Sequence, residues 1–153
     1  MRCGGSQGLR RRRLTRRAFW RRYGRLEHER LEFKTSVHHI CESVVAMAMT
    51  SGGTILVGVA DDRTIRGHPV EQRSLDRIAA VANETHVDVA VELLEVAGTP
   101  VLSITVPAVA PRVVTTPDGR LLRRVGSANQ PLRGDGVLRF LGQRAGWEEA
   151  PAA

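Results

Sequence analysis

Lysine is almost absent from this chain of 153 residues, in which Lys34 is the sole lysine beside 22 arginines. Cysteine is scarce as well. Cys3 and Cys41 lie far apart and form no CxxC pair, which favours reduced thiols in a cytoplasmic protein over a disulfide or a cysteine metal site. No apolar run approaches the roughly 20 residues that cross a bilayer, so a membrane partner is not expected.

Acidic residues are missing from the first 25 positions, which hold ten arginines. The remaining 128 residues carry 13 basic and 16 acidic side chains, so the positive charge of the chain belongs to this arm. The arm is predicted to be disordered or helical. As a helix it would fold on nucleic acid or an acidic surface; otherwise it is a solvated tail or the product of a start codon placed too far upstream.

Three further absences exclude particular functions. A twin-arginine export signal needs an apolar stretch after its arginine pair, and "RRYGRLEHER" follows Trp20 instead. The glycine-rich "SGGTILVGV" lacks the Gly-Lys-Ser/Thr ending of a phosphate-binding loop and precedes a strand, which argues against ATP binding. The five histidines show no metal-binding spacing.

The first half of the domain predicts a strand, a helix and a second strand. "RLEFK" (30–34) alternates polar and apolar residues, as a half-buried strand does. Thr35 or Ser36 is expected to cap a helix that continues to about Met49, and "TILVGVA" (54–60) has the continuous apolar character of a buried strand. The short spacing predicts a parallel, right-handed crossover.

The second half predicts a helix over 74–84 and two alternating strands joined at "AGTP" (97–100) as a hairpin. A further strand, "RLLRRVGSAN", and a short closing helix over 136–144 complete the domain. The expected class is therefore α+β, with a β-α-β-α-β-β core, a mixed sheet, an extra C-terminal strand and a short helix.

Charged side chains collect where the two parallel strands end. Glu32 and Lys34 share one face of the first strand, and Asp61 and Asp62 follow the second. Ligands tend to bind beyond the carboxyl ends of parallel strands, so these groups are expected to converge. Glu27 joins them only if the chain turns before the first strand, because the odd separation from Glu32 otherwise places the two on opposite faces.

Carboxylates beside a lysine can hold a divalent metal, orient water and neutralise a phosphate. A compact ammonium suits that last role better than a guanidinium fork does. The alternative is a solvated strand face on which Glu32 and Lys34 form a weak ion pair. The spacing of the residues does not decide between the two interpretations.

A second candidate site is "RRVGSANQP". Arg123, Arg124, Ser127 and Asn129 offer guanidinium, hydroxyl and amide groups to a nucleic-acid backbone. The alternative here is an ordinary strand that ends in a polar turn.

Four segments together resemble one known family. They are "LEFKTS" (31–36), "AMAMTSGGTILVGVADDRTIRG" (46–67), the Val-Pro pair at 106–107 and "RRVGSAN" (123–129). Their order is similar to that in the AlbA-like domain of the Schlafen family, over about residues 26–141. The resemblance implies an Alba-type α+β module that binds nucleic acid, described in bacterial members as a DNA-binding domain.

Some members of that family are endonucleases that cut tRNA and rRNA with three carboxylates supporting a metal. Matched motif by motif, the resemblance implies Glu27, Glu32 and Asp61 as ligands of a metal such as Mg²⁺ or Mn²⁺. In such a nuclease Lys34, on the same strand face as Glu32, is expected to act as a fourth catalytic residue at the phosphate. Two positions depart from the family pattern: Met49 stands where asparagine is usual, and Ala60 where an acid is frequent.

The nucleases of the family use a duplicated pair of such units, whereas this chain contains one, so a homodimer would be needed to imitate the pair. The expected organisation is an arm over 1–25, the AlbA-like domain over 26–144 and a tail over 145–153. Nucleic-acid binding, to DNA or RNA, is the function predicted. A metal-dependent RNA endonuclease and a regulatory protein-interaction domain remain the alternatives.

Overall fold

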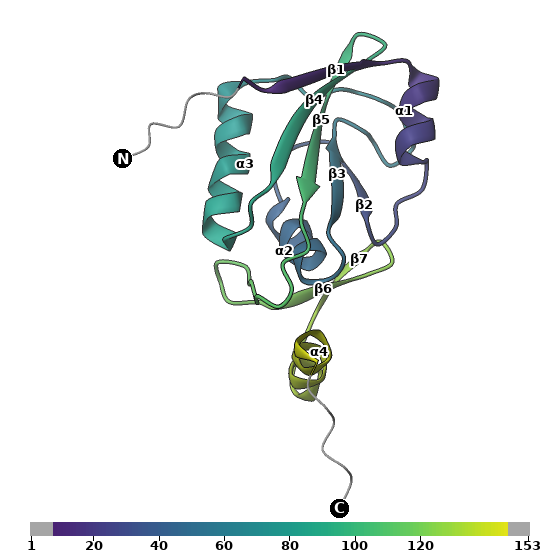
Figure 1. The fold of residues 1–153 in the computed structure, drawn as a ribbon. Helices are drawn as coiled ribbons and strands as arrows, with labels where there is room; N and C mark the ends of the chain where they lie inside the picture. Colours follow the sequence, from purple (N-terminus) through teal and green to yellow (C-terminus); the bar gives the residue numbers. More distant parts are fainter. Residues whose placement is uncertain (1–7, 147–153) are drawn as a thin grey trace, which may run out of the picture.

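The computed structural model describes residues 8–146 and has an α+β fold, as the sequence predicts. The elements follow one another in this order: β1 (Arg10–Leu14), α1 (Arg16–Tyr23), β2 (Leu31–Lys34), α2 (Cys41–Met49), β3 (Gly53–Val57), α3 (Gln72–Thr85), β4 (Ala90–Val96), β5 (Thr99–Val106), β6 (Leu122–Val125), β7 (Ala128–Pro131) and α4 (Asp135–Ala145). Figure 1 shows a central sheet with helices on both sides and α4 apart from it.

The main sheet is mixed and has the strand order β1-β4-β5-β3-β2. Strands β2 and β3 are parallel, with Leu31 opposite Thr54, which confirms the predicted crossover through α2. Strands β4 and β5 form the predicted antiparallel hairpin, and its two-residue turn, Ala97-Gly98, has positive φ at both positions. Such turns match the right-handed twist of the strands they join.

Helix α2 begins later than the sequence predicts. It starts at Cys41, preceded by a turn in which His39 has a φ of 61°, and neither Thr35 nor Ser36 caps it. Val37 and Ile40 are nevertheless buried in the core. Apolar spacing of three and four residues therefore identified side chains that face inward, while two of them belong to the turn before the helix.

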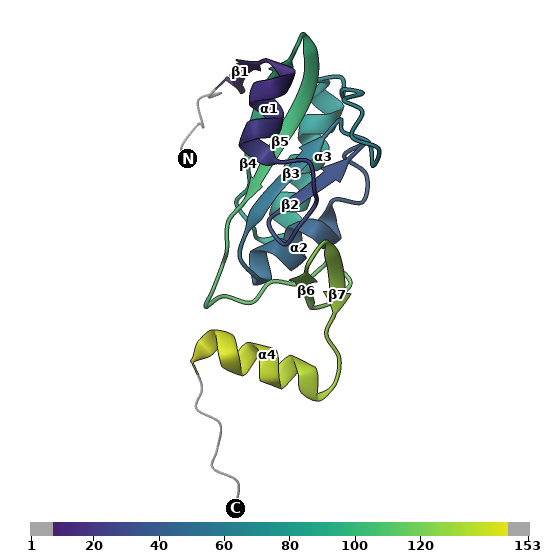
Figure 2. The ribbon, with the colours of Figure 1, turned by 90° about the vertical axis from the view of Figure 1, so that its right-hand side faces the viewer.

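The two faces of the sheet carry separate hydrophobic clusters. Helices α2 and α3 cover one face, where Ile55, Val57 and Ile104 lie. Helix α1 covers the other face, together with Phe33 and Leu56; Figure 2 shows α1 in front of the sheet and α3 behind it. Because side chains alternate along a strand, Glu32 and Lys34 point toward the α2 face and Phe33 points toward α1.

The N-terminal segment differs from the expected arm. Residues 10–14 add a fifth strand, parallel to β4, and Arg12 and Arg13 form ion pairs with Glu92 and Glu95. Thr15 caps α1 by accepting a hydrogen bond from the Ala18 N–H. The arginine-rich segment thus forms a strand and then a helix, where the sequence predicts a disordered or helical arm. Residues 1–7 lie outside the described part.

Helix α1 packs on the sheet through the fully buried Phe19, and the partly buried Trp20 and Tyr23 pack against the same hydrophobic cluster. Phe19 has no exposed surface, and its ring lies within 5.0 Å of the Trp20 centroid and 5.2 Å of the Tyr23 centroid. Burying a side chain of this size contributes roughly 2–3 kcal/mol to folding. A helix with four exposed arginines can therefore dock on the sheet through its aromatic residues.

A two-stranded hairpin, β6–β7, lies against α2, and the sequence predicted its first strand but not its return strand. The glycine pair that follows α2 allows the close approach of neighbouring backbone: Gly52 has a φ of 71°, and a Cβ there would lie 2.7 Å from the Val106 oxygen. A side chain at Gly53 would meet the Arg30 oxygen at the same distance. This explains both glycines of "SGG".

Candidate nucleic-acid interface

Three predicted site residues meet where β2 faces the β6–β7 hairpin. Glu32 lies 3.6 Å from the Lys34 Nζ and 3.6 Å from a terminal nitrogen of Arg124, both measured to the same carboxylate oxygen. The Glu32 and Lys34 side chains are 10% and 28% exposed, and that of Arg124 is fully buried. The carboxylate is thus neutralised from two sides within the protein.

Arg124 is committed to internal contacts. Its guanidinium donates to the Asn129 side-chain oxygen at 2.8 Å and to the carbonyl oxygens of His28 and Leu31 at 3.3 Å each. The Asn129 amide in turn donates to the Ser43 hydroxyl at 3.0 Å. Buried polar groups need such partners, and here they attach the hairpin to α2 and to the start of β2.

The backbone adds a further link between the hairpin and α2. The Arg124 N–H donates to the Thr50 hydroxyl at 2.8 Å, and that hydroxyl donates to the Ala46 carbonyl at 2.8 Å. Two buried atoms of the cluster, Glu32 Oε2 and Arg124 Nε, have no hydrogen-bond partner within residues 8–146. These hydrogen bonds therefore connect the hairpin, α2 and the start of β2, although two buried polar atoms of the cluster lack a hydrogen-bond partner among the described residues.

Glu27 supports β2 from outside the sheet. His28 and Leu31 pair through two backbone hydrogen bonds of 3.1 Å, so the chain does turn before β2, the condition that a shared site required. The Glu27 carboxylate then accepts the Phe33 N–H at 2.8 Å. Because β2 is an edge strand, this carboxylate satisfies a donor that would otherwise face outward.

Asp61 and Asp62 are exposed on the loop after β3. The Asp62 carboxylate accepts the Thr64 N–H at 2.9 Å, and this hydrogen bond is the main reason why the pKa of Asp62 lies below its usual value. The next residue, Arg63, has a φ of 71°, and its guanidinium lies over the Phe33 ring at 5.0 Å. Phe33 points to the face opposite Glu32, so the loop crosses to that other face.

Glu27, Glu32 and Asp61 consequently do not form a ligand set. Within residues 8–146, no group of three or more His, Cys, Asp or Glu side chains is placed to hold a metal ion. One carboxylate binds a backbone N–H, the second pairs with Lys34 and Arg124, and the third is on an exposed loop. The residues as arranged do not fit a Mg²⁺ or Mn²⁺ site, which requires converging oxygen ligands.

The predicted nucleic-acid contacts separate into two groups. Arg124 and Asn129 are engaged inside the protein, as described above. Ser127 is exposed in the β6–β7 turn, and Arg123 is half-buried, with its Nε donating to the Gln130 side chain at 2.9 Å. A binding role for Lys34, Arg123 and Ser127 stays a prediction that their partial exposure permits.

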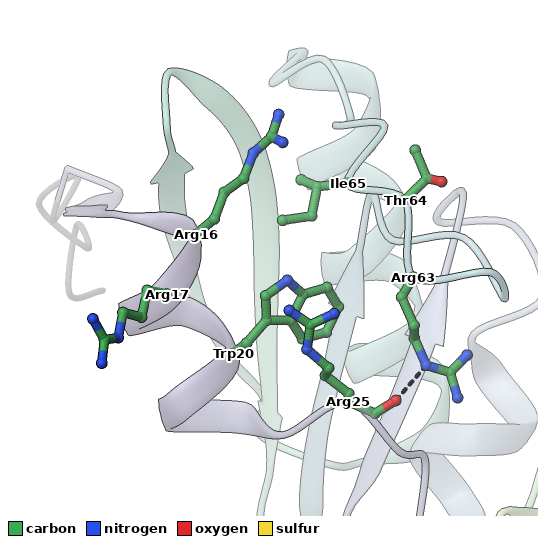
Figure 3. A pocket seen from close by; sticks show the side chains of 7 residues that line it. All are labelled: Arg16, Arg17, Trp20, Arg25, Arg63, Thr64 and Ile65. Atoms are coloured by element: carbon green, nitrogen blue, oxygen red, sulfur yellow. Dashed lines mark hydrogen bonds between the residues drawn. The ribbon is translucent and has the colours of Figure 1, made fainter.

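A basic cavity that the sequence did not predict lies between α1 and the loop after β3. Its volume is about 530 Å³. Figure 3 shows its lining, which consists of Arg16, Arg17, Trp20, Arg25, Arg63, Thr64 and Ile65. Four arginines and one indole thus line the same cavity, and no carboxylate of residues 8–146 is among the lining side chains.

The arginines of this cavity have no carboxylate partner in the part of the chain that the structure describes. None of the four forms an ion pair with an acidic side chain of residues 8–146. Arg25 instead lies over the Trp20 ring at 5.0 Å, a cation–π contact worth about 0.5–1 kcal/mol at an exposed position. Arg63 donates to the Arg25 and Asp61 carbonyl oxygens, so its guanidinium is held in place.

The residue types of this cavity are visible in the sequence, but their arrangement in space is not. The alternation of arginine with aromatic residues in the arm suggested nucleic acid, but nothing in it indicated that α1 would dock beside Arg63. That contact joins residues about 40 positions apart, and no local pattern reports it.

Comparison with known proteins assigns the family. The family described as "Schlafen, AlbA_2" matches residues 27–133, which is most of the chain, and the protein therefore belongs to it. This confirms the resemblance drawn from the four sequence segments. A search of curated proteins finds no match.

Among solved structures, the fold is similar to the crystal structure of the DIP2311 protein from Corynebacterium diphtheriae. The TM-score is 0.62 at 22% sequence identity, and the match covers 76% of this chain but 27% of that protein. The likeness supports the fold alone, and this chain spans about a quarter of the length of that neighbour. None of the helices in residues 8–146 is long and apolar enough to span a bilayer.

Proposed function

We propose that this protein binds nucleic acid through the cavity between α1 and the loop after β3. The observation that carries the proposal is a cavity lined by four arginines and an indole ring, without a carboxylate of residues 8–146 among the lining side chains. Arginine pairs with phosphate oxygens through its planar fork of donors, and it also stacks on bases. Membership of the Schlafen AlbA_2 family supports the same class of ligand.

Charge around the cavity favours a polyanion over a small anion. Arg21 and Arg22 follow on the same helix and are exposed, and α1 contains no acidic residue. The positive surface therefore continues beyond the cavity along α1, as a contact with successive phosphates requires. Lys34, Arg123 and Ser127 are proposed as weaker contacts. Lys34 already pairs with Glu32, Arg123 is half-buried and bonded to Gln130, and Ser127 offers one uncharged hydroxyl.

No observation favours the metal-dependent ribonuclease. The three carboxylates that the family resemblance implies form no metal-binding group in the described part of the chain, and Glu32 is engaged in ion pairs with the buried Arg124 and the partly exposed Lys34. The interaction-domain alternative predicts no nucleic-acid binding, and the experiment below separates it from the proposal.

The test measures binding of labelled single-stranded and duplex DNA and RNA by fluorescence anisotropy between about 50 and 300 mM salt. In the variant Arg16→Ala/Arg17→Ala, two exposed guanidinium groups leave the cavity, and alanine preserves the helix. The slope of log affinity against log salt should become shallower by about 0.7 for each single-strand phosphate that the variant no longer binds. Affinity at low salt should fall, with the unfolding midpoint unchanged.

The matched control is Arg73→Ala/Arg77→Ala, which removes two exposed arginines from α3 on the opposite side of the sheet. It should leave both the affinity and the salt slope as in the wild type. Equal losses in the two double variants would show nonspecific attraction and contradict the proposed site. Absence of any binding would support the interaction-domain alternative.

A further inference from the structure

The cavity contains more than charge, and its indole suggests what kind of nucleic acid enters it. The ring plane of Trp20 lies at 73° to that of Phe19 and at 85° to that of Phe33, with centroid distances of 5.0 and 6.0 Å. Both neighbours belong to the cluster under α1, so the indole is fixed in orientation by the core. Trp20 is nevertheless half-buried and reaches the cavity.

The cover of this indole is a single exposed side chain. Arg25 lies over the ring, and Figure 3 shows its guanidinium in front of the indole. No acidic side chain of residues 8–146 anchors the Arg25 guanidinium, which contacts the ring itself. A flat base can therefore stack on the guanidinium or take its place on the indole, since both surfaces accept a π-face.

Two arginines that can bind phosphate, Arg63 and Arg16, also line the cavity that contains Arg25 and Trp20. Arg63 is held by the Arg25 and Asp61 carbonyl oxygens and by the Phe33 ring, so its guanidinium is in position before a ligand arrives. Its backbone adopts a left-handed conformation, which is uncommon for a residue other than glycine and is supported by the Asp62–Thr64 hydrogen bond. Arg16 lines the cavity from the side of α1.

We propose that the cavity takes an unpaired nucleobase on the Arg25–Trp20 pair, with the adjoining phosphates on Arg16 and Arg63. The inference rests on the proposed function and narrows its ligand to a single strand or an extruded base. In a duplex the base faces are already stacked within the helix, whereas a free base can enter a recess. A volume of about 530 Å³ falls within the roughly 300–1,000 Å³ of small-ligand sites.

The site joins a segment outside the family match to a loop within it. Trp20 and Arg25 precede residue 27, and Arg63 lies inside the matched range. Base stacking here is accordingly a property inferred for this chain from its own N-terminal segment.

The experiment uses intrinsic fluorescence in the full-length chain with Trp147→Phe, which leaves Trp20 as the sole tryptophan. The probes are a single-stranded oligonucleotide as DNA and as RNA, the duplex of the same sequence, and an abasic strand with the same number of phosphates. The single strand should quench Trp20 fluorescence and bind roughly tenfold more tightly than the abasic strand, because the abasic strand has no base to stack. The duplex should not quench it.

Two variants test the Arg25–Trp20 stacking site directly. Trp20→Leu retains an apolar side chain for the cluster, and Arg25→Gln removes the guanidinium without touching the core. Each should weaken the binding of the normal single strand by roughly tenfold while leaving the abasic strand unchanged. If Trp20→Leu does not fold, Arg25→Gln and the abasic strand still show whether a base stacks in the cavity.

Equal affinity for the normal and abasic strands, or equal quenching by the duplex, would overturn the base site. Nucleic-acid binding through phosphates would then remain, provided that Arg16→Ala/Arg17→Ala still weakens it. Loss of all binding in every arm would instead remove the proposed function itself. The outcomes for RNA and DNA, compared at equal length, assign the sugar.

Discussion

Arginine performs opposite tasks in two regions of this molecule. Arg124 is fully buried beside Glu32 and donates to three oxygen acceptors of the protein. The arginines of the cavity at α1 have no carboxylate partner within residues 8–146, and Arg16, Arg17 and Arg25 are exposed. The same type of side chain therefore connects segments of the protein in one place and is exposed and accessible to a ligand in the other.

The difference shows that the surroundings of a guanidinium decide its role. Once buried, an arginine must have its charge and donors satisfied by the protein, and little capacity remains for a ligand. Where it is exposed and lacks an acidic neighbour, the charge is available to a phosphate. A count of arginines alone would include Arg124 of "RRVGSAN" among the binding residues, although it is buried and paired inside the protein.

The largest expected effect on stability comes from removing the buried Arg124 side chain. Arg124→Ala should lower the free energy of unfolding by about 3–5 kcal/mol, because it leaves buried Glu32 with Lys34 alone and removes one of the two donors to each of the His28 and Leu31 carbonyl oxygens. Urea denaturation followed by circular dichroism measures the effect. A drop below about 1 kcal/mol, with nucleic-acid affinity reduced instead, would transfer Arg124 to the ligand-binding class.

The second effect concerns the floor beneath the cavity. Phe19→Ala should destabilise the protein by about 3 kcal/mol, since it empties a fully buried site between α1 and the sheet. The measurement is again the denaturation midpoint. Leu26→Ala is the matched control, because Leu26 is 73% exposed and should be neutral. A neutral Phe19→Ala would show that α1 is not docked and that the cavity does not persist.

A smaller effect is expected at Lys34. Lys34→Met should cost about 1 kcal/mol, since it removes one of two positive charges near the Glu32 carboxylate at a partly exposed position. Its effect on nucleic-acid affinity should be weaker than that of Arg16→Ala/Arg17→Ala. Lys34→Arg is the control that retains the charge. An affinity loss as large as that of the double variant would place Lys34 in the binding surface.

The smallest effect concerns the turn that orients Arg63. Asp62→Ala removes the acceptor for the Thr64 N–H and should lower the unfolding midpoint slightly, while Asp62→Asn keeps an oxygen acceptor and should not. The pKa of Asp62 is lowered in the folded state, so its stabilisation is present above the usual value of 3.8 and is lost as the pH falls through the folded pKa.

The difference between wild type and Asp62→Ala should therefore be constant near neutral pH and shrink in acid. Thermal unfolding of both proteins between about pH 2.5 and 7 provides the comparison. A difference that grows as the pH falls would contradict the assigned hydrogen bond.

Much of the fold could be predicted because its signals are local. The alternation in "RLEFK" and the apolar run of "TILVGVA" led to β2 and β3, and the short span between them required a parallel crossover. The segments typical of the family predicted the AlbA_2 assignment. The start of α2 was misplaced because inward-facing residues of a turn and of a helix share the same spacing.

The N-terminal segment was difficult to predict for the opposite reason. In β1, four arginines in five positions obscure a strand whose contribution is backbone pairing with β4 and ion pairs to two glutamates. Such pairing depends on which edge of the sheet is open, and that is decided by the order of the other strands. The burial of Arg124 depends in the same way on where the hairpin docks.

The order of residues along the chain was enough to establish the α+β class, the crossover at β2–α2–β3 and the family, since hydrophobic periodicity and ordered segments are local properties. Which charges meet depended on the tertiary structure. It separated Glu27, Glu32 and Asp61, placed Arg124 inside, and brought Arg63 beside Arg16, Trp20 and Arg25. Electrostatic and stacking interactions depend on distance in space, which a linear pattern of residue types does not specify.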